Sequence, residues 1–150
     1  MRIPLQVIDN GMATVIASLS APKYRVRSCR VEFIVDTGST ETIISERDTL
    51  GFSFSTSSLQ VHKGTKIMNV NFNLHKMENV SLAFLTDEPA KVERLNLPSI
   101  LVSRATKRGP KNMNEAYKIP SLLGIDFLLK NKFRLFLSSS EKKAYLEKIE

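Results

Sequence analysis

The segment Asp36-Thr37-Gly38-Ser39 is the part of the sequence best suited to chemistry. It directly follows the apolar run Phe33–Val35, which is typical of a strand buried on both faces. Gly38 permits a positive φ, so the chain can turn sharply beneath the carboxylate, and backbone N–H groups in such a turn can donate hydrogen bonds to it. Thr37 and Ser39 add hydroxyl groups. The pattern predicts a carboxylate fixed at the end of a rigid strand, with an ordinary turn as the alternative.

Other site chemistries have little support in the sequence. Cys29 lies in the strand-like segment 24–35 with no histidine nearby to activate it, so we expect a core residue rather than a nucleophile. His62 and His75 are isolated and lack the spacing of a zinc site. No phosphate-binding loop or dinucleotide fingerprint is present. We therefore expect neither a metal nor a cofactor.

Length and composition favour one globular domain over residues 1–150. No apolar run is long enough to span a bilayer, and the first residues lack the pattern of a signal peptide. A single cysteine excludes an internal disulfide, which favours a reducing compartment and predicts a cytoplasmic protein that does not contact the membrane.

The charge of the chain is positive and unevenly distributed. The net charge is +7, and residues 91–118 hold seven Lys and Arg against two Glu, a local excess of +5. A basic patch can attract nucleic acid. This one lacks the regularly interleaved aromatic side chains of a stacking platform, so we interpret it as a solvated loop and do not expect nucleic acid as a partner. Segment 103–119 is predicted to be a basic insertion or loop.

Short strand-like segments dominate the rest of the chain. They predict a hairpin across the turn Asp9–Gly11, a second hairpin over 58–74 with its tip near Lys63–Thr65, strands near 79–85 and 97–103, and a closing hairpin over 132–149. Helical signals are brief: one turn after Ser45, with Asp48 in a capping-box position, and a short helix with Asp126 as its N-cap. This predicts an all-β, barrel-like domain with one or two short helices.

The segment Val31–Ser39 resembles the active-site signature of the pepsin-like and retroviral-type aspartic proteases, in which apolar residues precede Asp-Thr-Gly. That family has a second element, two apolar residues and a glycine, beside the catalytic loop, and Leu122, Leu123 and Gly124 match it. It also has a β-hairpin flap between the two elements, which corresponds here to the predicted hairpin with His62, Lys63, Gly64 and Thr65 near its tip. The resemblance covers most of residues 3–149.

The resemblance implies a closed, barrel-like acid-protease lobe that acts as a two-fold homodimer. One chain holds one Asp-Thr-Gly, so the retropepsin-like type implies that Asp36 of two copies forms the catalytic pair. Thr37 would then hydrogen-bond across the axis, and Ser39 would hydrogen-bond the carboxylate. The implied substrate is an extended polypeptide, and no cofactor is implied.

Three functions follow as hypotheses. The first is a homodimeric aspartic endopeptidase that hydrolyses peptide bonds. The second is a non-catalytic dimerisation or peptide-binding module with the same fold, which does not explain why Asp-Thr-Gly-Ser is intact. The third is a basic nucleic-acid-binding β-barrel, which explains the charge but not the two motifs.

Overall fold

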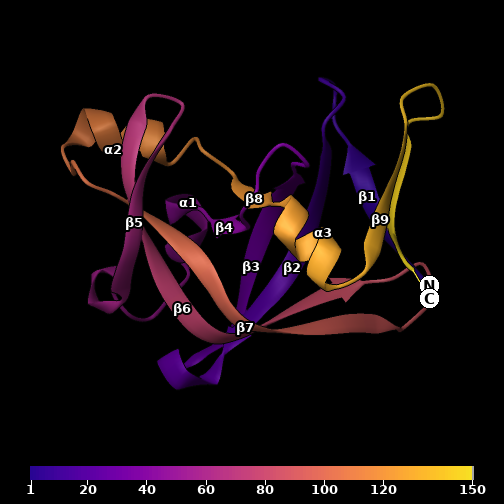
Figure 1. The fold of residues 1–150 in the computed structure, drawn as a ribbon, viewed down its shortest axis with the longest axis horizontal. Helices are drawn as coiled ribbons and strands as arrows, with labels where there is room; N and C mark the ends of the chain where they lie inside the picture. The colour runs from indigo at the N-terminus through magenta and orange to yellow at the C-terminus, as the bar shows by residue number, and fades with distance from the viewer. Residues whose placement is uncertain (150) are drawn as a thin grey trace.

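Ten strands form one hydrogen-bonded sheet in a computed structural model that describes residues 1–149 (Figure 1). In chain order they are β1 (Arg2–Val7), β2 (Ala13–Ala21), β3 (Val26–Val35), β4 (Ile43–Ile44), β5 (Gln60–Ile67), β6 (Val70–Leu85), β7 (Val92–Ala105), β8 (Ser121–Leu123), β9 (Phe133–Ser138) and β10 (Lys143–Lys148). Three α-helices are short: α1 (Glu46–Thr49), α2 (Pro110–Ala116) and α3 (Ile125–Lys130). Two 3₁₀ turns complete the described elements, at Pro22–Tyr24 and Thr56–Ser58.

The order of strands places distant parts of the chain side by side. It runs β5-β6-β7-β4-β8-β3-β2-β1-β10-β9, and β6 also pairs with β2. Successive pairings therefore lead from β6 through β7, β4, β8, β3 and β2 back to β6. The predicted all-β class is confirmed as a mostly-β fold, with three short α-helices in residues 1–149 where one or two were predicted. The closed, barrel-like form stays a prediction, which this ring of pairings supports.

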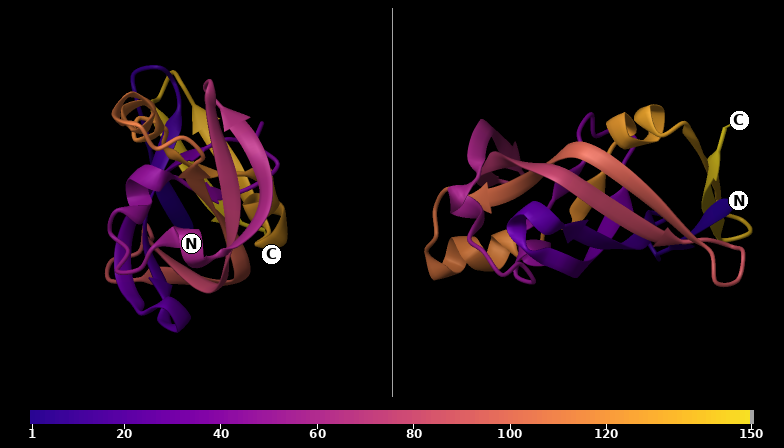
Figure 2. Two further views of the ribbon diagram at one scale, coloured as in Figure 1. Left: turned by 90° about the vertical axis from the view of Figure 1, so that its left-hand side faces the viewer. Right: turned by 90° about the horizontal axis from the view of Figure 1, so that it is seen from below.

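The hairpin of β6 and β7 is the long axis of the molecule (Figures 1 and 2). One end lies by α2, and the other lies near the chain termini, where Asp87 N donates to Arg2 O (2.9 Å). Along the hairpin, apolar side chains such as Leu82 and Phe84 alternate inward and join Phe33 and Leu123 in the main core. No helix in residues 1–149 is long and apolar enough to cross a membrane.

Two predictions about local structure were wrong. Segment 103–119 is not a plain loop, because β7 continues to Ala105 and α2 follows after a short connection. The tip of the β5–β6 hairpin lies at Met68–Asn69 rather than at Lys63–Thr65. Met68 and Asn69 have φ values of 49° and 68°, the left-handed conformation of a tight hairpin turn. Gly64 instead lies within β5, paired with Asn73.

Candidate active site

Three strands hold the loop that carries Asp36. β3 ends at Val35, and β8 runs parallel beside it with Leu123 opposite Val35. The backbone N–H of Asp36 donates to Leu123 O (3.0 Å), so the pairing continues into the loop. On its other side β8 pairs with β4, which follows the loop. The structure therefore brings the Asp-Thr-Gly segment and the apolar-Gly segment together.

The Asp36 carboxylate is oriented by its own loop. The Gly38 N–H donates to Asp36 Oδ1 (2.9 Å), and the Ser39 N–H donates to Asp36 O (3.1 Å). Gly38 does not use the positive φ that glycine permits; among the described glycines, Gly11 has one. The lack of a side chain matters instead, because a Cβ at Gly38 would lie 3.2 Å from Asp36 Oδ1. Asp36 is half-buried, while Thr37 and Gly38 are exposed. The carboxylate is thus fixed at the surface of one chain.

Ser39 fixes the loop rather than the carboxylate. Its Oγ donates to Glu41 O (2.7 Å), which differs from the implied bond to the Asp36 carboxylate. Its carbonyl accepts from Ile125 N (2.8 Å), at the start of α3. Ser39 therefore ties the end of the Asp36 loop to the segment that follows β8.

Gly124 allows two backbone segments to pack closely. A Cβ at this position would lie 2.6 Å from Glu41 O and 2.9 Å from Ser39 O, distances that real Cβ atoms do not show. These atoms belong to the backbone and cannot rotate away. Gly124 is thus required by its contact with the loop that follows Asp36.

A buried threonine joins the loop to α3. Thr42 Oγ1 donates to Asp126 Oδ1 (2.7 Å) and accepts from Gly124 N (3.0 Å), and Thr42 N donates to Asp126 Oδ2 (3.2 Å). The prediction of Asp126 as an N-cap was wrong, because Gly124 holds that position and Asp126 lies within α3. The sequence analysis missed Thr42. Its signal is a hydroxyl residue directly before the apolar pair Ile43–Ile44.

We expect Thr42→Val to lower the free energy of unfolding by about 2 to 3 kcal/mol. Valine keeps the shape but leaves Gly124 N without its acceptor and Asp126 Oδ1 without its hydroxyl donor. Urea denaturation measures the change. Thr40→Val is the control, because Thr40 is exposed. Equal stability of both variants would contradict this role of Thr42.

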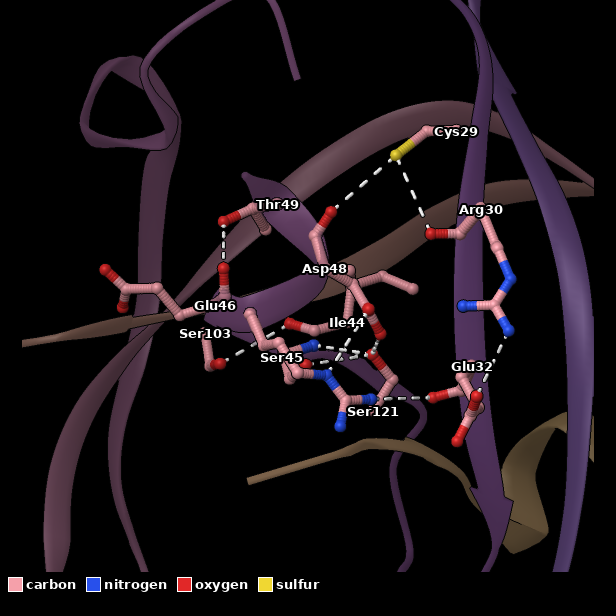
Figure 3. A network of polar contacts seen from close by, with 11 residues as sticks. Cys29, Arg30, Glu32, Ile44, Ser45, Glu46, Asp48, Thr49, Ser103 and Ser121 are labelled. Atoms are coloured by element: carbon pink, nitrogen blue, oxygen red, sulfur yellow. Dashed lines mark hydrogen bonds and ion pairs between the residues drawn. The ribbon is translucent and has the colours of Figure 1, made fainter. Parts of the chain in front are cut away.

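A second polar network fixes α1 beside the same strands (Figure 3). Ser121 Oγ, on β8, accepts from Ser45 N (2.8 Å) and donates to Asp48 Oδ2 (2.6 Å). Ser45 does precede the helix, but the predicted capping box between Ser45 and Asp48 does not form. Ser45 N and the Asp48 carboxylate both bond to Ser121 Oγ instead of to each other. The Cys29 thiol donates to Asp48 O (3.6 Å). Burial raises the pKa of Cys29, and the Asp48 carboxylate adds to this, which suits a core residue rather than a nucleophile.

The predicted flap residues lie within β5 instead of at a hairpin tip. Lys63 forms an ion pair with Glu41, which follows the catalytic loop. His62 lines a pocket of about 220 Å³ together with Glu41, Thr42, Asp126 and residues of β7 and α3. Asp36 does not line this pocket. Gly64 and Thr65 pair with Asn73 and Phe72.

The remaining histidine is structural. His75 is buried, and its Nδ1 lies 2.9 Å from Leu59 O. Within residues 1–149, no three side chains of His, Cys, Asp or Glu gather as a metal site would need.

The fold is similar to that of a solved protease structure. The crystal structure of a retropepsin-like aspartic protease from Rickettsia conorii matches with a TM-score of 0.60 and 16% identity, covering 99% of this chain and 91% of that chain. The fold is retropepsin-like. EIAV protease complexed with the inhibitor HBY-793 matches with a TM-score of 0.37 and 16% identity, over 83% of this chain and 91% of that one. No protein-family model and no curated protein sequence matches the chain. At 16% identity, this similarity concerns the fold alone. It confirms, for the fold, the resemblance seen in the sequence.

Proposed function

We propose that the protein is an aspartic endopeptidase whose active site is completed by a second copy of the chain. The observation that carries this proposal is the setting of Asp36. Its carboxylate is oriented by the Gly38 N–H at the surface, and among residues 1–149 no Lys, Arg or His forms an ion pair with it. A carboxylate that only stabilised the fold would not need to be oriented at the surface without a cationic partner. The likeness in fold to an aspartic protease supports the same conclusion.

The chemistry requires two carboxylates that share one proton. Like charges a few ångströms apart do not both ionise readily, so one Asp36 would be ionised and the other protonated over a working range of pH. The ionised member removes a proton from a bound water, which attacks the peptide carbonyl. The protonated member polarises that carbonyl and later supplies a proton to the leaving nitrogen. The two titrations belong to the pair.

A two-fold homodimer provides the second carboxylate from the same sequence. A two-fold axis brings residue i of one copy close to residue i of the other, and exposed Thr37 and Gly38 let the loop approach its partner. Thr37 would donate across the axis. The homodimer is therefore part of the proposed mechanism.

The substrate is proposed to be an extended polypeptide that lies against the β5–β6 hairpin as an added strand. β5 is at the edge of the sheet, so its outer backbone groups are not used by another described strand. Lys63 and Glu41 connect this hairpin to the segment after the catalytic loop. The turn end at Met68–Asn69, where Met68 is 77% exposed, takes the place of the tip predicted near Lys63–Thr65.

The test is hydrolysis of a mixed peptide library from acidic to neutral pH, with Asp36→Asn as the matched variant. Cleavage by the parent and none by the variant supports the proposal. Equal cleavage by both proteins would overturn the assignment of Asp36. A stable dimer that binds peptides without cutting them would instead support the non-catalytic module.

A further inference from the structure

The basic segment 106–119 packs against the turn end of the hairpin instead of extending into solvent. Met113, Ala116 and Ile119 are buried with Val70 and Phe72 in a cluster separate from the main core. Figure 1 shows α2 at the same end of the molecule as the β5–β6 turn. The segment predicted as a loop is thus the packing partner of the hairpin.

This contact lies where the pairing of β6 with β7 ends, at Phe72 opposite Ala105. Val70 and Phe72 lie just after the turn at Met68–Asn69, and Ile67 before the turn also packs on the cluster. In β5, residues 60–64 are exposed. Apolar burial is the main favourable term that can hold such an edge in place. Beyond the last pair with β7 and the bond from Thr106 N to Asn71 O (3.0 Å), the turn end is therefore held by the cluster with α2.

An ion pair between buried Glu46 and Arg108, whose side chain is 40% exposed, fastens the same segment to α1. Glu46 is 3% exposed; its Oε1 accepts from Arg108 Nη1 (2.6 Å), and its Oε2 accepts from Ala105 N (2.6 Å). Breaking one partner of a buried pair leaves an uncompensated charge, which is strongly unfavourable. Glu46 begins α1, close after β4 and the catalytic loop. Segment 106–119 is thus anchored to α1 through Arg108 and to the hairpin through the cluster.

We propose that segment 106–119 is a clamp that limits the movement of the β5–β6 hairpin and thereby controls the entry of the peptide. This inference rests on the proposed function, because it assumes that the hairpin lies over the substrate. The hairpin cannot swing at its turn end without leaving the cluster or carrying α2 with it. A clamped hairpin is preorganised for binding, since less ordering is needed when the peptide arrives.

Hydrogen exchange measured by mass spectrometry tests the clamp without reference to activity. Met113→Ala removes much of the contribution of α2 to the cluster, and Asn114→Ala is the control because Asn114 is exposed. We expect exchange at residues 65–72 to become at least about fivefold faster in Met113→Ala, with β9 and β10 unchanged. In hydrolysis, we expect KM to rise about three- to tenfold while kcat changes less than about twofold.

Several outcomes would overturn the clamp. Unchanged exchange at residues 65–72, or equal acceleration throughout the chain, would show that α2 contributes general stability only. Should Met113→Ala fail to fold, Ile119→Val removes one methylene group from the same cluster and carries the same expectations. Faster exchange in Met113→Ala, combined with a parent protein that cuts no peptide, would support the restraint on the hairpin and refute the proposed function together with control of peptide entry, so the two failures are distinguishable.

Discussion

Adding the Asp36→Asn variant to the parent protein is expected to suppress peptide hydrolysis by the parent. If each active site takes one carboxylate from each copy, a mixed dimer has one carboxylate and is inactive. With free exchange of subunits, about a ninefold excess of variant leaves about a tenth of the original activity, because few parent chains still meet a parent chain. The measurement is the initial rate of cleavage after the mixture has equilibrated.

The controls separate this effect from simple dilution. Asp36→Asn alone is expected to lose at least about a thousandfold in kcat/KM with its thermal midpoint unchanged. Asp9→Asn makes the same change in charge in the turn between β1 and β2 but keeps Asp36, so a ninefold excess of it should raise the measured rate about tenfold instead of lowering it. A parent rate that is indifferent to excess Asp36→Asn, despite exchange of subunits, would show that one chain holds a complete site.

Replacing Gly124 by alanine is expected to have the largest effect on stability. The added Cβ would lie 2.6 Å from Glu41 O, 2.7 Å from Glu41 C and 2.9 Å from Ser39 O. Because all three are backbone atoms, the catalytic loop must move away from β8. We expect a loss of about 3 kcal/mol in the free energy of unfolding and, since Asp36 lies on that loop, loss of hydrolysis.

Gly109→Ala is the matched control for this substitution. Gly109 precedes α2, has a φ of −65°, and a Cβ there would meet nothing within 4 Å. Its urea midpoint should equal that of the parent. If Gly124→Ala were as stable and as active as Gly109→Ala, the close approach of the two backbones would not be a requirement of the site.

The site was predictable where local sequence determines it. An apolar strand followed by Asp-Thr-Gly indicated the loop of Asp36, and the segment Leu122–Gly124 indicated its neighbour. The bond from Thr42 to Asp126 was not predictable, because it joins residues 84 positions apart. Ser39 likewise bonds to a backbone carbonyl whose position depends on the folded loop.

Two predictions about the fold were wrong although the sequence contained signals for the observed structure. The hairpin turn was assigned to Gly64 because glycine favours turns, whereas Asn69 also adopts a positive φ. Helix α2 was missed because the basic segment around it was interpreted as a loop. Gly109 and Pro110 are typical of a helix start, and Met113 and Ala116 have the spacing of one buried face.

The pairing of β3 with β8 has a consequence for how the chain acquires activity during folding. The two strands come from opposite ends of the sequence, and β4 lies on the far side of β8. Such non-local contacts form only after long loops have closed, which makes them slow to form. The carboxylate therefore gains its setting late, once α2 and β8 have joined the earlier strands. A nascent or partly folded chain would hold Asp36 on an unformed loop, so the proposed peptide hydrolysis would begin only in completed molecules.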